Sequence, residues 1–154
     1  MSASISTTLS DDLLAFIARS PSPWHAAANV AAQLQAARFQ ALDEKHAWHL
    51  QPEGRYFVTR DDGSLIAFVI GRDVINHGFR IIGAHTDSPG LRVKANGAHD
   101  SAGYLRLATE VYGGPILATF TERDLLLAGR VMVRDVSSND GIKTVKAIRL
   151  WTHF

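Results

Sequence analysis

The sequence has 154 residues, of which 46% are hydrophobic and 20% are charged, and its formal net charge is +1. This length fits about one domain, and the composition is that of a globular chain rather than a disordered one. The small net charge provides no electrostatic attraction for nucleic acid or for an anionic membrane, and the absence of cysteine excludes disulfides, thiolate metal sites and a cysteine nucleophile.

Two helices are predicted near the N-terminus. The first covers residues 10–20, where apolar side chains recur on one face. The second covers about 24–38, because Ser22 followed by Pro23 is a typical helix opening, with serine as the cap and proline in the first turn.

The N-terminus lacks the basic start and apolar stretch of a secretory signal, and no run of about 18 apolar residues could cross a membrane. We therefore expect a cytoplasmic protein with no membrane partner.

Strand patterns begin after the second helix. Residues 55–70 are predicted to form a hairpin, because two β-prone runs flank the turn sequence DDG at 61–63. Residues 79–84 follow as a short apolar run bounded by glycines. Such a run is typical of a central strand that is buried on both faces. Ile81 and Ile82 are accordingly expected in the core.

The remaining residues are predicted to be rich in strands. A brief extended piece covers 91–96, residues 95–103 have a loop-like composition, and further strands are expected in GYLRLATEVYGG, PILATF and ERDLLLAGRVMVRD. The composition shift there suggests a boundary between an α/β part, 1–95, and a β-rich part, 96–154, whose tail from Val136 is less patterned. This order of elements predicts an α/β or mixed α+β fold.

His85 and Asp87 follow the apolar run at 79–84 and are the candidate functional residues. Residues two apart in a strand face the same side, so both could point past its carboxyl end, where open α/β sheets place ligands. Neutral imidazole is a good zinc ligand, and a nearby carboxylate fixes the orientation of the ring. By itself, however, such a pair is more often a hydrogen-bonded polar pair, and zinc needs three or four ligands.

The longer strings around this pair carry more information than the pair does. His85 and Asp87 lie in GAHTDSPGLRVK, and the chain also contains SPSPWHAAANVAAQL, AWHLQPEGRYFVTRDDGSLIAFVIG and EVYGGPILATFTERDLLLAGRV. Together, and in this order, the four strings resemble the motifs of the M18 family of metallo-aminopeptidases, the aspartyl aminopeptidase family. The resemblance extends from about Leu9 to Val133.

This resemblance implies a fold, an activity and roles for two residues. The fold would be a zinc-peptidase-like α/β domain, with a β-rich oligomerisation domain inserted after about residue 95. The activity would be removal of N-terminal residues, often acidic, from peptides with a free N-terminus, by a homo-oligomer that uses two metal ions, usually zinc. On the same basis His85 would be a metal ligand and Asp87 would orient a metal-bound group.

The sequence departs from the family pattern mainly after Val133. A two-metal peptidase needs a bridging carboxylate, a general base and further ligands, and in the family these lie well past residue 154. A truncated gene, a frameshift, a fragment or a short paralogue would each produce such a chain. Glu110 is a weak ligand candidate and more simply a polar-face residue. We expect no activity from the chain alone, and the alternative is a non-catalytic oligomerising or regulatory short form.

The other histidines are expected to be structural or merely exposed. They are His25, His46, His49, His77, His99 and His153.

Overall fold

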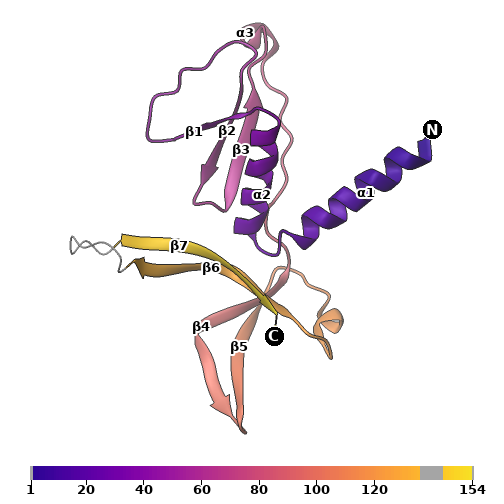
Figure 1. The fold of residues 1–154 in the computed structure, drawn as a ribbon, viewed down its shortest axis with the longest axis vertical. Coiled ribbons are helices and arrows are strands. Elements are labelled where there is room, and N and C mark those ends of the chain that lie inside the picture. Colours follow the sequence, from indigo (N-terminus) through magenta and orange to yellow (C-terminus); the bar gives the residue numbers. More distant parts are fainter. Residues whose placement is uncertain (1, 136–143, 154) are drawn as a thin grey trace.

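The computed structural model describes residues 2–135 and 144–153 (Figure 1). Its helices and strands confirm the predicted mixed α/β class. In chain order they are α1 (Ser2–Ala18), α2 (Pro23–Ala36), β1 (Gln40–Leu42), β2 (Arg55–Arg60), β3 (Ser64–Val69), α3 (Val74–His77), β4 (Gly90–Ser101), β5 (Tyr104–Tyr112), the 3₁₀ helix η1 (Leu117–Phe120), β6 (Leu126–Asp135) and β7 (Thr144–His153). Within the described part, no helix is long and apolar enough to cross a membrane.

Both N-terminal helices are present. Helix α1 starts earlier than predicted and projects away from the rest of the molecule (Figure 1), so that apolar side chains such as Leu13 and Ile17 stay exposed. Helix α2 opens as predicted. Ser22 has extended backbone, its hydroxyl accepts a hydrogen bond from the backbone N–H of His25, and Pro23 occupies the first turn.

The predicted hairpin at 55–70 is confirmed as β2 and β3, which pair antiparallel, while β1 joins β2 in parallel. Asp61 and Asp62 in the turn have φ of 50° and 54°, a left-handed conformation that aspartate tolerates better than most residues.

Helix α2 packs on one face of this sheet. Its small residues Ala26 and Ala27 are buried, as are residues 56–58 of β2, and together they form the core of the described molecule.

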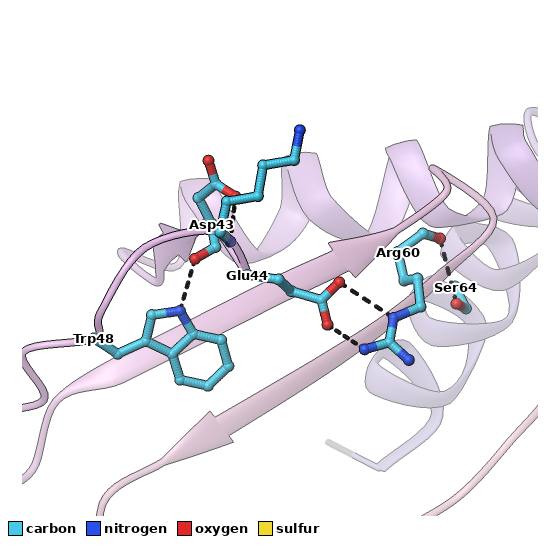
Figure 2. A network of polar contacts seen from close by, with 6 residues as sticks. Asp43, Glu44, Trp48, Arg60 and Ser64 are labelled. Atoms are coloured by element: carbon cyan, nitrogen blue, oxygen red, sulfur yellow. Dashed lines mark hydrogen bonds and ion pairs between the residues drawn. The ribbon is translucent and has the colours of Figure 1, made fainter.

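The loop after β1 covers part of the opposite face of the sheet (Figure 2). The indole nitrogen of Trp48 donates to the backbone carbonyl of Asp43 over 2.8 Å, and its ring stacks on Phe68. Glu44 accepts two hydrogen bonds from the guanidinium of Arg60, one of them over 3.2 Å. These bonds lower the pKa of Glu44 and raise that of Arg60.

The predicted central strand at 79–84 is wrong. Residues 78–85 belong to no helix or strand, and the side chains of Ile81 and Ile82 are 88% and 99% exposed. A strand that is buried on both faces needs a neighbouring strand at each edge and a covering layer on each side. The described elements supply neither for this run, so its backbone and side chains remain in water.

The region around residue 95 is strand rather than loop. Strand β4 continues to Ser101 and pairs with β5, with a β-bulge between Val93 and Ala98. At Gly97 a Cβ atom would lie 2.8 Å from the backbone oxygens of Lys94 and Ala108, so the bulge requires glycine there. The division of the chain into 1–95 and 96–154 stays a prediction, although the loop that suggested it is absent.

Two predictions about the following residues have different outcomes. The string PILATF is not a strand but contains η1, where the hydroxyl of Thr119 bonds back to the carbonyl of Ile116 over 2.7 Å. Such local bonds compete with strand pairing, and Pro115 cannot donate to a ladder. Strand β6 is confirmed. It pairs along its length with β7, so residues 144–153 form a strand in a tail whose sequence showed little pattern. Residues 136–143 lie outside the described part.

Two contacts of one arginine join the β6–β7 hairpin to the unit formed by α2 and the β1–β2–β3 sheet. Arg130 of β6 donates to the carbonyl of Asp61 over 2.7 Å and lies 5.1 Å from the ring centroid of Trp24. The two hairpins β4–β5 and β6–β7 nevertheless diverge (Figure 1). The accessible surface is 12883 Å², against roughly 7,700 Å² for a compact monomer of this size. The molecule therefore leaves surface open that a compact fold would bury.

Candidate functional site

His85 and Asp87 lie in the irregular segment between α3 and β4. The prediction that His85 sits at the carboxyl end of a strand is wrong, because the run before it is not a strand. A tertiary contact positions the segment instead. The hydroxyl of Thr86 donates to the carbonyl of Gly63 over 2.7 Å, which ties the segment to the β2–β3 turn.

The two predicted residues contact each other directly. Nδ1 of His85 lies 2.8 Å from the backbone oxygen of Asp87 and 3.1 Å from its Oδ1. Both partners are acceptors, so Nδ1 must carry the proton. In the neutral ring Nε2 is then unprotonated, and it is the nitrogen with a lone pair for a metal ion. The expectation that His85 lies within hydrogen-bond reach of a carboxylate is confirmed.

Tyr112 completes the arrangement and was not predicted as a site residue. Its hydroxyl donates to Oδ2 of Asp87 over 2.6 Å. This bond is the main cause that lowers the pKa of the Asp87 carboxyl, and it raises the pKa of the phenol. Asp87 therefore stays ionised at neutral pH. The guanidinium of Arg92 lies 5.2 Å from the centroid of the Tyr112 ring, within the range of a cation–π contact.

The bulge in β4 brings Tyr112 to this position. Tyr112 is the last residue of β5 and pairs with Gly90, whereas an unbroken register from the hairpin turn would place it opposite Val93. Gly113 then turns away with φ of +69°, close enough to Pro89 that a Cβ would lie 3.4 Å from its Cα. A glycine following an asparagine at 96–97 was the available sequence signal for the bulge.

The other acidic and histidine candidates do not join this cluster. Glu110 is exposed and pairs in register with Arg92 across the hairpin. Four of the six other histidines have a local polar partner for Nδ1, in accordance with a structural role; these partners are Ser22 for His25, Asp43 for His46, Asp73 for His77 and Gly97 for His99. The side chain of His153 lies outside the described part.

The site can supply one ligand of a metal centre. Among the described residues there is no group of three or more histidine, cysteine, aspartate or glutamate side chains that could hold a metal ion. Zinc is held by three or four ligands. His85 with its carboxylate partner has the chemistry of one such ligand, and Asp87 is already engaged by His85 and Tyr112.

Comparisons with known proteins give a consistent result over most of the chain. A family model described as aminopeptidase I zinc metalloprotease (M18) matches residues 16–150. A probable M18 family aminopeptidase 2 from Pseudomonas paraeruginosa is 51% identical over 127 residues, which are 82% of this chain and 30% of that protein. The chain thus spans about 30% of the length of the curated relatives it matches.

Solved structures agree with these matches. A chain in the cryo-EM structure of the Ape4 and Nbr1 complex is 42% identical with a TM-score of 0.83, and the match covers 91% of this chain and 26% of that chain. The structure of the S. cerevisiae mApe1 dodecamer gives a TM-score of 0.78 at 26% identity, covering 94% and 33%.

The family match also corrects one expectation about the tail. It continues to residue 150, so the prediction that the sequence departs from the family pattern after Val133 is wrong for residues 134–150. Short motif strings miss such a segment because a strand can keep its β-branched and apolar character while individual residues change.

Proposed function

Because the chain belongs to the M18 family of aminopeptidases, we propose that it supplies one corner of the active site of a zinc aminopeptidase. The reaction is hydrolysis of N-terminal residues, preferentially acidic ones, from peptides with a free N-terminus. The observation that supports this most directly is the geometry at His85. Two oxygens of Asp87 hold Nδ1 as the protonated nitrogen, which leaves Nε2 free for a metal ion.

Each residue of the corner has a separate task in this proposal. His85 would hold a zinc ion through Nε2, and Asp87 would fix the tautomer and orientation of the ring. A carboxylate on the far nitrogen also makes a histidine ligand more basic. When bound, zinc would polarise the peptide carbonyl and lower the pKa of a bound water.

The 154 residues by themselves are expected to be inactive in this proposal. One histidine cannot hold zinc against water, and the described residues provide no second and third ligand beside it. Loss of the general base alone removes about 10²–10⁴-fold in rate. The assay is release of aspartate or glutamate from a short peptide in the presence of zinc, cobalt or manganese. Turnover by the pure chain at about 1 s⁻¹ or faster, an ordinary enzyme rate, would contradict this expectation.

A chimera tests whether this chain carries a working corner. The matching segment of the Pseudomonas paraeruginosa relative would be replaced by the segment of this chain, which is 51% identical to it. We expect the chimera to cleave acidic N-terminal residues and its His85→Ala variant to lose activity and bound zinc. His46→Ala is the matched control, because that histidine is exposed on a loop and pairs locally with Asp43. Equal activity of the His85→Ala chimera would refute the ligand assignment.

One observation favours a second role, that of an oligomerising or regulatory short form. The accessible surface exceeds that of a compact monomer by about 5,000 Å², and the apolar residues of 79–84 are exposed. A solved structure similar to this chain is a dodecamer. Light scattering at several protein concentrations tests self-association, and a strictly monomeric chain would exclude the oligomerising form of this role.

A further inference from the structure

The carboxylate of Asp87 uses its two oxygens for two different partners. Oδ1 lies 3.1 Å from Nδ1 of His85, and Oδ2 accepts the hydroxyl of Tyr112 over 2.6 Å. The three side chains therefore form a chain from phenol to carboxylate to imidazole. Hydrogen bonds to a carboxylate are shorter and stronger than those between neutral groups, so the phenol is the firmest side-chain contact that Asp87 makes.

Tyr112 is fixed by strand pairing, whereas His85 and Asp87 are not part of any helix or strand. It ends β5, pairs with Gly90 and has Arg92 over its ring. His85 and Asp87 come from a segment that has neither helix nor strand from residue 78 to residue 89. The β4–β5 hairpin thus determines where the Asp87 carboxylate lies, through the hydrogen bond from the Tyr112 phenol.

We propose that Tyr112 is a positioning residue that acts through Asp87 to keep His85 in the Nδ1–H tautomer. Without the phenol, Oδ2 of Asp87 accepts hydrogen bonds from water instead. The carboxylate is then free to change its side-chain torsion angles, and Oδ1 loses its fixed place beside Nδ1 of His85. The imidazole is then held by the backbone oxygen of Asp87 alone. Its Nε2 loses its fixed direction, which matters because outer partners of metal ligands affect metal affinity by about 10–100-fold.

This inference rests on the proposed function for its significance, because it concerns the residue assigned as a metal ligand. Its test does not need metal or activity. Imidazole ¹⁵N chemical shifts distinguish a protonated from an unprotonated nitrogen, so histidine-labelled chain at mildly alkaline pH reports the tautomer of His85 directly. The signal is assigned by its loss in His85→Ala.

The decisive comparison is between Tyr112→Phe and Tyr104→Phe. Both remove one phenol from β5, but Tyr104 lies at the far end of the hairpin and pairs with Ser101. We expect the parent and Tyr104→Phe to show the Nδ1–H tautomer. In Tyr112→Phe the two ring nitrogens should move toward the averaged shifts of a mixed-tautomer imidazole. Unchanged shifts in Tyr112→Phe would overturn the proposal.

A second variant shows whether Tyr112 acts through Asp87. In Asp87→Ala the preference for the Nδ1–H tautomer should already be weakened, because only the backbone oxygen at position 87 remains as an acceptor for Nδ1, and adding Tyr112→Phe should change nothing further. An additional shift in the double variant would mean that the phenol acts by another route. If Tyr112→Phe disturbs the hairpin, as seen in the backbone signals of β4 and β5, Asp87→Ala alone decides the question, because a population of the Nδ1–H tautomer equal to that of the parent contradicts the proposal.

The two proposals fail in different ways. An active His85→Ala chimera rejects the metal-ligand role and leaves the tautomer result standing. An unchanged tautomer in Tyr112→Phe rejects the positioning role and leaves the chimera result standing.

Discussion

Glu44 and Arg60 form the ion pair that fastens the loop after β1 onto the sheet (Figure 2). The pKa of Glu44 is lowered in the folded chain, mainly because Arg60 donates hydrogen bonds to it. A lowered pKa means that the folded state favours the ionised form. The resulting stability is fully present above the unfolded pKa and is lost as the pH falls through the lower folded value.

The first prediction follows from the lowered pKa of Glu44. Glu44→Gln should lower the melting temperature slightly at neutral pH, and the difference from the parent should vanish at a pH below the folded pKa of Glu44. The effect is small because both side chains are in contact with solvent and water screens the pair. Thermal unfolding followed by circular dichroism over a pH series measures it.

Glu53→Gln is the matched control for this prediction. Glu53 pairs with Arg72 over 2.7 Å, but both side chains are more exposed than those of the Glu44 pair. We expect its melting temperature to differ less from the parent at neutral pH. A Glu44→Gln deficit that is as large in acid as at neutral pH would show that lost packing, not charge, causes it.

At the residue scale, the sequence predicted the contacts between residues that are close to each other in the chain. The Ser22 cap needs only the next three residues, and the contact of His85 with Asp87 needs only a separation of two. Tyr112 could not be found in this way. Its contact with Asp87 spans 25 positions in sequence, and it depends on a bulge that moves the pairing of β5 away from the register set by the turn.

The β-bulge of β4 is the element that this site depends on most. Gly97 lies within it, and a side chain there would meet two backbone oxygens at 2.8 Å. Backbone atoms cannot move aside as flexible side chains can. A substitution at Gly97 must therefore change the bulge, and with it the pairing of β5 near Tyr112.

The second prediction is that Gly97→Ala destabilises the β4–β5 hairpin by about 1–3 kcal/mol, the usual cost of overpacking. The Tyr112 to Asp87 contact should be lost with it, so that the His85 tautomer signal moves as in Tyr112→Phe. Denaturant unfolding and the histidine ¹⁵N spectrum measure the two effects.

Gly129→Ala serves as the control, because it also adds a methyl group to a strand glycine but would meet no atom within 4 Å. Alanine there should be neutral or slightly stabilising. Comparable destabilisation by both substitutions would rule out the steric explanation for Gly97.

At the element scale, prediction succeeded where an element is specified by its own residues. The α2 helix has its cap and proline, and the β2–β3 hairpin has its turn, so both formed where expected. Residues 79–84 have the apolar composition of a buried strand, but burial on both faces is a property of neighbours. The exposure of Ile81 and Ile82 shows that composition alone does not create a strand.

The whole molecule exposes about 5,000 Å² more surface than a compact monomer of its size. A standard protein interface buries about 1,600 Å² in total. One such interface would therefore cover only part of the excess. The apolar residues of 79–84 belong to no helix or strand, and Ile81 and Ile82 are exposed, so their side chains are accessible to a second chain.

The last prediction concerns which surface drives association of this chain with itself. Ile82 is 99% exposed, so Ile82→Asp removes apolar surface and adds charge without breaking an internal contact. We expect the variant to keep the helix and strand signals of the parent and to associate at a higher protein concentration, as measured by sedimentation velocity. Leu14→Asp is the control, because Leu14 is an exposed apolar residue on α1, outside the run at 79–84. If Leu14→Asp weakens association and Ile82→Asp does not, the contact surface lies on α1. If neither variant differs from the parent, association does not depend on exposed apolar side chains at these two places, and the run at 79–84 is not the surface that a second copy covers.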